Sequence, residues 1–241
     1  MTRLAARVAR RLRYAGWTRQ CPGCGARLRR YEPYSELGTQ CPRCGAKDRH
    51  RLVALYLRQR SMAARSNPRV LHFAPEAALR DVVAALGPAA YLSADIEPGA
   101  ADLEADITDL PLDDGSFDLV ICSHVLEHIP DDAAALRELA RVTASSGEAL
   151  ILSPVSYALD ATVEDPDTTP AERLRYFGQE DHVRVYGPDL AQRIEAAGMT
   201  VERFDPDDVP ERDRAAAGIS REVGAYGLRN EIYVGRPRAP R

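Results

Sequence analysis

The chain has 241 residues, enough for one sizeable α/β domain and a small additional module. Its composition is that of a globular protein, and no apolar run is long enough to span a bilayer. Arginines interrupt the N-terminal stretch where a signal peptide would need an apolar core, so we expect a cytoplasmic protein with reduced thiols.

The net charge of −4 conceals an asymmetry between two parts of the chain. Residues 1–66 hold 16 basic and 3 acidic residues, a net charge of +13. Residues 67–241 hold 16 basic and 33 acidic residues, a net charge of −17. We therefore expect two modules, with the boundary at Ser66-Asn67-Pro68, where the proline disfavours a helix. The basic module either binds a polyanion such as nucleic acid or docks on the acidic module, and both interpretations remain open.

Residues 1–16 predict a short basic helix, with Leu4, Val8 and Leu12 spaced four residues apart on one face. A basic amphipathic helix can lie on an anionic membrane or on nucleic acid. The apolar face is narrow, which favours packing against the neighbouring domain.

Two CPxCG segments follow, and they contribute two pairs of cysteines: Cys21, Cys24, Cys41 and Cys44. Sixteen residues separate the pairs, a spacing expected for a four-cysteine zinc site. Two thiolates so spaced can hold one ion from a tight turn, and the glycine after each pair permits positive φ. A redox-active pair is the disfavoured alternative, because no βαβ pattern surrounds these segments. Four cysteines leave no open position, so we expect a structural Zn2+ that stabilises this small zinc-ribbon module.

From residue 48 onward, helices and strands alternate. Strands are predicted over 69–73, 91–94, 102–105, 117–122, 149–152, 200–204 and 231–234, and helices over 48–65, 75–86, 133–143, 171–176 and 190–197. Such alternation predicts a mainly parallel, doubly wound sheet. The apolar run Phe117–Cys122 fits a strand covered on both faces, and open α/β sheets bind ligands at the carboxyl ends of such strands.

Several segments of the sheet region have a characteristic order and spacing. They are Tyr91-Leu-Ser-Ala-Asp95, Ala105-Asp-Ile-Thr-Asp-Leu-Pro111, Gly115-Ser-Phe-Asp-Leu-Val-Ile-Cys-Ser-His-Val-Leu-Glu-His128, and Leu136-Arg-Glu-Leu-Ala-Arg-Val142 followed by Gly147. In this arrangement residues 69–154, and more loosely the chain up to residue 235, resemble the class I S-adenosylmethionine-dependent methyltransferases. The resemblance implies a Rossmann-like seven-stranded sheet with one antiparallel strand in its last hairpin, and S-adenosyl-L-methionine as cofactor.

The resemblance also implies a set of cofactor-binding residues. Asp95 lies 20 residues after Pro75, where dinucleotide-type folds keep a carboxylate for the ribose hydroxyls. Ile96 would face the adenine. In the family, the position matching Asp106 contacts the adenine amino group, although a turn or helix cap is its alternative role. The full set is Phe73, Ala74, Pro75, Glu76, Asp95, Ile96, Asp106, Ile107, Ser123 and His124.

The loop after the first sheet strand departs from the family, because it contains no glycine. Its sequence is His72-Phe-Ala-Pro-Glu76, so we expect negative φ throughout and Pro75 in the first turn of the next helix. Glu76 suits that helix N-terminus and could also meet the ammonium group of the cofactor.

Methyl transfer requires a positioned nucleophile and a base that can remove its proton. We predict His124 and His182 as catalytic residues, since histidine titrates near neutrality and His124 follows the strand end directly. His128 is a weaker candidate. The polar segment 155–187 is expected to bind the acceptor through Gln179, His182, Arg184 and Tyr186, with a solvated loop as the alternative.

The sequence thus predicts a basic N-terminal helix, zinc ribbon and linker helix over residues 1–66 and a methyltransferase domain over residues 67–241. The favoured acceptor is a small molecule or sugar-like metabolite. One alternative is an RNA methyltransferase whose basic module binds phosphates. The other is a non-catalytic adaptor that kept the fold and lost the glycine loop.

Overall fold

The apolar run at the centre of the sequence forms strand β8 (Phe117–Ser123), and all its residues except Asp118 are buried. In the computed structural model, β8 pairs in parallel with β5 (Arg69–Phe73) on one side and β9 (Thr143–Leu152) on the other. The structure describes residues 3–35, 38–61, 67–165, 167–221 and 227–238. Both faces of β8 are covered, as its continuous apolar sequence requires.

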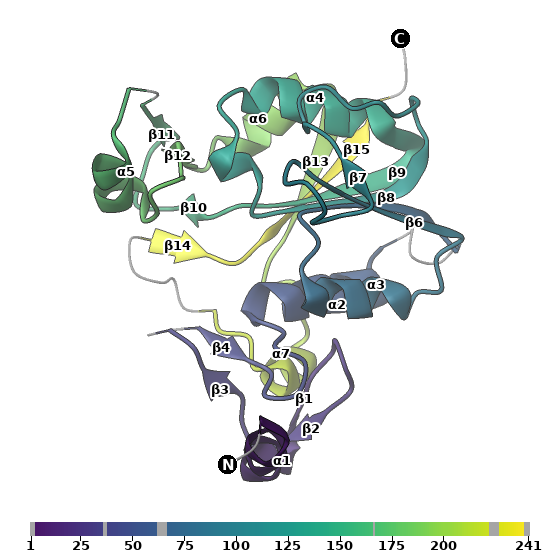
Figure 1. The fold of residues 1–241 in the computed structure, drawn as a ribbon, viewed down its shortest axis with the longest axis vertical. Helices are drawn as coiled ribbons and strands as arrows, with labels where there is room; N and C mark the ends of the chain where they lie inside the picture. The colour runs from purple at the N-terminus through teal and green to yellow at the C-terminus, as the bar shows by residue number, and fades with distance from the viewer. Residues whose placement is uncertain (1–2, 36–37, 62–66, 166, 222–226, 239–241) are drawn as a thin grey trace. The chain divides into compact units, whose positions relative to one another are not determined.

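The main sheet has seven strands in the order β13-β15-β9-β8-β5-β6-β7. The remaining members are β6 (Ala90–Asp95), β7 (Leu103–Glu104), β13 (Met199–Phe204) and β15 (Ile232–Pro237). β15 is antiparallel to both of its neighbours, whereas the pairs from β9 to β7 are all parallel. The predicted Rossmann-like sheet with one antiparallel strand is confirmed (Figure 1).

Helices α4 (Asp132–Val142) and α6 (Leu190–Ala196) lie side by side along one face of this sheet (Figure 1). Apolar positions of α4 recur at helical spacing, so Leu136, Leu139 and Val142 are fully buried in the main core. The helix begins where the Asp131 carboxylate accepts a hydrogen bond from the backbone N–H of Ala134.

Some elements differ from the sequence prediction. A single 3-10 turn, η2 (Leu126–His128), follows β8, and β9 begins six residues earlier than predicted. The segment 155–187 contains β10 (Val155–Ser156), β11 (Val163–Glu164), α5 (Pro170–Phe177) and β12 (Arg184–Val185). Helix α7 (Glu211–Ala217) and strand β14 (Leu228–Arg229) were not predicted, because their sequences lack a clear apolar period.

The chain folds into two compact units, and each unit is built from segments that are not consecutive in the sequence. One comprises Met1–Ser61, Glu76–Leu86 and Asp205–Glu222, and the other comprises Met62–Pro75, Gly87–Phe204 and Val223–Arg241. The predicted division at residues 66 and 67 therefore stays a prediction.

Within the described residues, the first unit contains short hairpins and four helices. Its strands are β1 (Ala15–Gln20), β2 (Arg27–Leu28), β3 (Glu32–Pro33) and β4 (Thr39–Gln40), and its helices are α1 (Arg3–Tyr14), α2 (Asp48–Gln59), α3 (Ala77–Ala84) and α7. The fully buried Arg51 guanidinium binds these segments together, donating to the carbonyl oxygens of Ala46 and Ala217 at 2.7 Å each. Residues 1–2 and 62–65 of the predicted helices lie outside the described residues.

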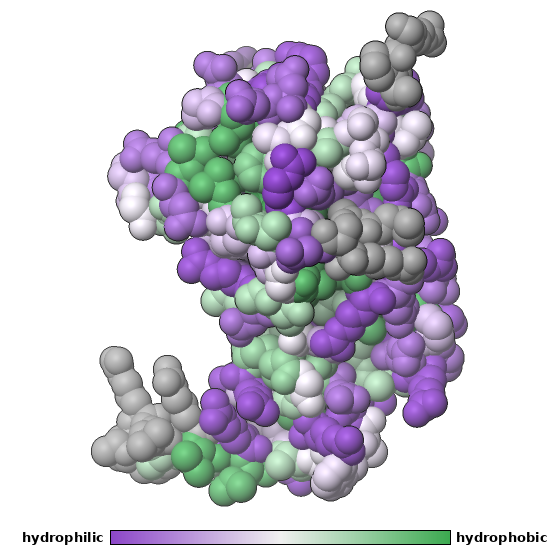
Figure 2. All heavy atoms as spheres, turned by 90° about the vertical axis from the view of Figure 1, so that its right-hand side faces the viewer, coloured by the Kyte–Doolittle hydropathy of each residue, from purple (hydrophilic) through white to green (hydrophobic). Residues whose placement is uncertain are grey.

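The exposed positions of α1 contradict the packing predicted for its apolar face. Val8 and Leu12 are 48% and 72% exposed, so these two side chains face solvent. Figure 2 shows one face of the molecule, where apolar groups lie among predominantly hydrophilic atoms. Among the described residues, no helix is both long and apolar enough to cross a bilayer.

Candidate functional site

The carboxyl ends of three neighbouring strands bring the predicted cofactor residues to one edge of the sheet. Phe73 at the end of β5 is in register with Ala94 in β6 and with Cys122 in β8. The residues that follow these partners are Ala74, Asp95 and Ser123, so all three lie at the same edge. This is where open α/β sheets bind ligands.

Two residues at this edge have left-handed backbone conformations. Ala74 has φ +44° and His124 has φ +56°, although neither is glycine. The expectation of negative φ throughout the loop is therefore wrong. The Ala74 N–H donates to the carbonyl oxygen of Ala94 at 2.9 Å, which extends the pairing of β5 with β6 by one bond. Such conformations are uncommon outside glycine and often mark functional sites.

Asp95 and Ile96 form an acidic and apolar pair at the end of β6. The Asp95 carboxylate is half-buried and accepts the N–H of Glu97 at 3.0 Å through one oxygen, Oδ1. Ile96 is 62% exposed, which is unusual for a large apolar side chain at a strand end. A carboxylate beside an exposed apolar side chain suits a ribose with its attached base, and both assignments stay predictions.

Asp106 and Ile107 lie in the segment after β7. Asp106 is exposed, and its Oδ1 accepts hydrogen bonds from the N–H and the hydroxyl of Thr108 at 2.8 and 2.7 Å. These contacts fit the alternative turn role of Asp106. Ile107 is 4% exposed and packs in the main core. Adenine contacts by these two residues remain predictions.

The Glu76 carboxylate belongs to the first unit, where it contacts two basic side chains. Its oxygens lie 2.5 Å from Arg49 Nη2 and 2.8 Å from His50 Nε2. Burial alone would raise the pKa of Glu76, but the hydrogen bond and charge of His50 and the Arg49 guanidinium lower it to about 2. The carboxylate is ionised and engaged in these contacts, and its role toward a cofactor ammonium group is still a prediction.

The corner after β8 pairs His124 with a buried carboxylate. His124 Nδ1 lies 3.0 Å from Oε1 of Glu127, which is 1% exposed, without hydrogen-bond geometry between the two atoms. The Ser153 hydroxyl donates to Oε2 of the same carboxylate. Burial would raise the pKa of Glu127, but His124 and the Ser153 hydroxyl outweigh burial and lower it.

Ser153 was not among the predicted site residues, although it follows the carboxyl end of β9, the parallel neighbour of β8. The sequence could have indicated Ser153 only through its position, directly after a strand that ends at the same edge of the sheet. Cys122 is fully buried, and burial raises the pKa of its thiol, so it is part of the core.

The predicted acceptor-binding residues occupy different environments. Gln179 is exposed, whereas Arg184 is 3% exposed and Tyr186 is fully buried. The Arg184 guanidinium donates to the carbonyl oxygens of Leu126, Ile129 and Pro130, and the Tyr186 hydroxyl donates to Asp132 at 2.9 Å. Burial raises the pKa of Tyr186, which keeps the phenol neutral. These contacts give both residues a structural role, and acceptor binding remains a prediction for all four.

The structure brings His182 next to His128 rather than next to His124. The His128 and His182 rings are 4.7 Å apart and nearly perpendicular. His182 is 5% exposed, and its backbone neighbour Val183 donates an N–H to the carbonyl oxygen of Glu127 at 2.9 Å. The turn η2 is thus covered by the segment that carries His182.

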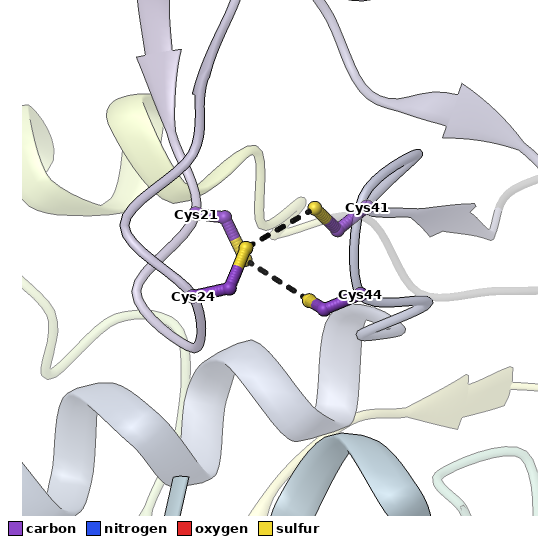
Figure 3. A group of neighbouring side chains, drawn as sticks. All are labelled: Cys21, Cys24, Cys41 and Cys44. Carbon is purple, nitrogen blue, oxygen red and sulfur yellow. Dashed lines mark hydrogen bonds between the residues drawn. The ribbon is translucent and has the colours of Figure 1, made fainter. Parts of the chain in front are cut away.

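The four predicted metal-binding cysteines lie together in the first unit (Figure 3). Cys21 and Cys24 on one loop face Cys41 and Cys44 on the other, with 3.8 Å between Sγ atoms in the pairs Cys21–Cys44 and Cys24–Cys41. A tetrahedron with Zn–S bonds of about 2.3 Å has edges of about 3.8 Å. Each loop closes with a glycine at positive φ, as the sequence predicted.

Comparison with known proteins finds similarity over part of the chain. Residues 80–151 match a family model described as a methyltransferase domain. The chain is 37% identical over 73 residues to ajmaline N-methyltransferase of Rauvolfia serpentina, covering 30% of this chain and 25% of that protein. It is 33% identical over 114 residues to demethylmenaquinone methyltransferase of Mycolicibacterium gilvum, covering 41% and 50%.

A third relative is named for its cofactor. The chain is 39% identical over 57 residues to the "Probable S-adenosylmethionine-dependent methyltransferase" of Mycobacterium tuberculosis, covering 24% of this chain and 21% of that protein. The chain therefore spans at most about half the length of these curated relatives.

Solved structures share the fold at low sequence identity. One is the complex between the Haloferax volcanii Trm112 methyltransferase activator and a protein described as a methyltransferase, at TM-score 0.55 and 18% identity over 79% of this chain and 92% of that one. Another is the [4+2]-cyclase SpnF, at TM-score 0.55 and 17% identity over 79% and 82%. The second neighbour carries a different name for its chemistry, so the shared fold alone does not define a reaction.

Proposed function

The chain carries an S-adenosylmethionine-dependent methyltransferase domain, and from this premise we propose that it transfers a methyl group from S-adenosyl-L-methionine to a small-molecule acceptor. The observation that carries the proposal is the common edge at which Ala74, Asp95 and Ser123 follow three paired strands. The left-handed turn at Ala74 lets the backbone bend away without a glycine.

The residues at this edge fit the cofactor. Asp95 uses Oδ1 for the Glu97 N–H, and a carboxylate has enough acceptor sites for two ribose hydroxyls as well. Ile96 offers an exposed apolar side chain to the adenine face. When bound, the cofactor supplies a methyl group on a positively charged sulfur, which leaves as a neutral thioether.

His124 is the proposed base. Its Nδ1 lies 3.0 Å from the Glu127 carboxylate, so Nε2 is the nitrogen proposed to accept the proton of the acceptor hydroxyl or amine as the new bond to carbon forms. The charge of the buried carboxylate stabilises the imidazolium that results. The left-handed backbone of His124 fixes the direction in which the side chain leaves β8.

A small acceptor is favoured because two of the relatives, ajmaline N-methyltransferase and demethylmenaquinone methyltransferase, are named for small molecules. The cytoplasm is the proposed location, since none of the five cysteines, all of which lie among the described residues, forms a disulfide.

Calorimetry with S-adenosyl-L-methionine tests the cofactor part of the proposal. Asp95→Ala should weaken binding at least tenfold, whereas Asp113→Ala, which removes an exposed carboxylate elsewhere, should leave it unchanged. If the wild-type protein binds no cofactor, the enzyme proposal fails and the non-catalytic adaptor becomes the preferred interpretation.

A nucleic-acid acceptor is the second candidate, and exposed aromatic side chains in the basic first unit support it. Trp17 is 82% exposed, with the Arg27 guanidinium 4.6 Å from its ring centre. Tyr34 is 45% exposed, with the Lys47 amine 5.3 Å from its ring centre. Aromatic rings beside cations can stack on unpaired bases.

Labelling a lysate with methyl-labelled cofactor and purified protein separates the two acceptors. We expect the label in a low-molecular-weight fraction that nuclease does not change. Label in a polymeric, nuclease-sensitive fraction would replace the small-molecule acceptor by a nucleic acid, and Trp17→Ala should then reduce labelling.

For the four-cysteine cluster we propose a structural Zn2+ held by Cys21, Cys24, Cys41 and Cys44. The support is the 3.8 Å spacing of the Sγ atoms, which matches the edge of a tetrahedral zinc–thiolate site. The apolar cluster around these cysteines is small, so the metal would supply much of the folding free energy of this unit.

A further inference from the structure

Three side chains with metal-binding groups converge beside the carboxyl end of β8. Glu127 and His128 belong to the turn η2, and His182 comes from the segment between α5 and β12. One possible ligand atom from each residue lies within 4.8 Å of the other two. Glu127 and His128 are neighbours in the chain, and His182 lies 54 residues beyond His128, so the fold has to bring His182 to them.

His182 presents an unpaired nitrogen to this cluster. Its Nδ1 lies 2.9 Å from the carbonyl oxygen of Phe177, which can only accept, so Nδ1 carries the proton and Nε2 holds a lone pair. Nε2 is buried and has no hydrogen-bond partner, and the whole residue is 95% shielded from solvent. A buried polar atom without a partner is costly, and a bound cation would satisfy it.

His128 has the same arrangement at its own Nδ1. That atom lies 3.2 Å from Oδ2 of Asp181, which leaves Nε2 of His128 as the nitrogen for a ligand. Histidines that bind metals usually donate their other ring N–H to a carboxylate or a backbone carbonyl. Here Asp181 supplies the carboxylate for one ring and Phe177 supplies the carbonyl for the other.

Glu127 supplies the negative charge. Its carboxylate is 99% shielded from solvent and lies against the His124 ring and the Ser153 hydroxyl. Ser153 occupies Oε2 and His124 lies near Oε1, but a carboxylate has about four acceptor positions. A lone pair therefore remains for a metal ion.

We propose that Glu127, His128 and His182 bind a divalent transition-metal ion such as Zn2+. Two imidazoles and one carboxylate suit such ions, and three protein ligands leave at least one position open. An acceptor oxygen or nitrogen that occupies the open position would lose its proton more readily. The ion would also fasten the segment carrying His182 to the turn after β8.

This site differs from the four-cysteine cluster in its donor atoms and lies in the other unit. The competing interpretation is a packed pair of neutral imidazoles without metal, which the perpendicular rings of His128 and His182 would also allow. The two interpretations predict different metal contents and different spectra.

Metal analysis of the untagged full-length protein, purified without chelator and dialysed against Zn2+, tests the proposal. We expect two zinc equivalents per chain in the wild type and one in His182→Ala. His124→Gln is the matched control, since it removes a histidine of the same corner outside the cluster, and it should keep both equivalents. Asp181→Asn should lower the affinity for the second zinc ion roughly 10- to 100-fold.

Cobalt substitution identifies which site is lost. Co2+ bound by thiolates shows strong sulfur-to-metal charge transfer, whereas Co2+ bound by nitrogen and oxygen does not. His182→Ala should lose only the second type of spectrum. If His182→Ala does not fold, the half-exposed His128→Ala takes its place. The proposal would be overturned if the wild type bound only one zinc equivalent, held by thiolates. It would also be overturned if the second zinc equivalent persisted in His182→Ala and His128→Ala. Neither result depends on whether S-adenosyl-L-methionine binds.

Discussion

The Arg184 guanidinium donates to the carbonyl oxygen of Pro130 at 2.9 Å and so closes the turn that follows β8. The same group also donates to Leu126 at 3.0 Å and forms an ion pair with Glu164 at 2.8 Å. The side chain was predicted to contact the acceptor, but its donors are used inside the protein. Its position suits a residue that holds the corner in place.

Replacing this arginine should therefore affect stability. Arg184→Met leaves several buried carbonyl groups without donors, and we expect a loss of about 3 kcal/mol or more. Arg137→Met is the control, because Arg137 is exposed on α4. Urea unfolding measures both free energies, and equal small losses in the two variants would show that the Arg184 contacts contribute little.

The left-handed conformation of Ala74 predicts the effect of a glycine there. A left-handed residue other than glycine costs about 1–2 kcal/mol, while glycine loses about 0.5–1 kcal/mol of chain entropy. Ala74→Gly should therefore leave stability unchanged or raise it by up to about 1.5 kcal/mol. Ala134→Gly in α4 should lower it by about 1 kcal/mol. If Ala74→Gly lost as much stability as Ala134→Gly, the left-handed conformation of Ala74 would not be strained.

The Glu76 carboxylate predicts a pH dependence of stability. Its pKa falls from 4.5 to about 2 on folding, so its contribution is complete above pH 4.5 and is lost as the pH falls toward 2. This change in the pKa of Glu76 corresponds to at most about 3–4 kcal/mol of stability.

Glu76→Gln should be less stable than the wild type at pH 7, and the difference between the two proteins should shrink below pH 4.5. Unfolding of both proteins between pH 7 and pH 3 measures this difference in stability. Loss of metal at low pH affects both proteins and therefore cancels in the difference. A difference that does not change with pH would mean that Glu76 acts through something other than its charge.

Metal content should depend on the four cysteines and not on the fifth. Cys41→Ser should bind one zinc equivalent fewer than the wild type and should unfold at lower temperature, because thiolate binding supplies folding free energy. Cys122→Ser keeps the ribbon intact and should retain all its zinc, since Cys122 lies in the core of the other unit. Unchanged zinc in Cys41→Ser would remove this cysteine from the site.

The sequence was most informative where a local pattern decides the structure. The apolar run Phe117–Cys122 predicted the central strand, and the cysteine spacing predicted the clustered thiols, because both depend on residues close in the chain. The approach of His182 to His128 depends on how the segment 155–187 folds back over η2. No local period encodes that return, so these two residues could not be paired from the sequence.

Backbone conformation was the second limit. Ala74 and His124 take positive φ although their residue types favour negative values, and the N–H group of each residue is bonded to a neighbouring strand end. Helix α7 was missed for a related reason. Its sequence Glu-Arg-Asp-Arg-Ala-Ala-Ala has little apolar pattern, and the carbonyl oxygen of Ala217 at its end receives a hydrogen bond from Arg51.

The bonds of Arg51 also bear on how this protein can be dissected or recombined. The guanidinium has no exposure, and its acceptors include Ala46 from the ribbon and Ala217 and Gly218 from far along the chain. A fragment ending near residue 66 would keep the cysteines but bury a cation that lacks two of its acceptors. The ribbon therefore cannot be exchanged between proteins on its own. A chimaera that replaces the ribbon must also replace residues 205–222.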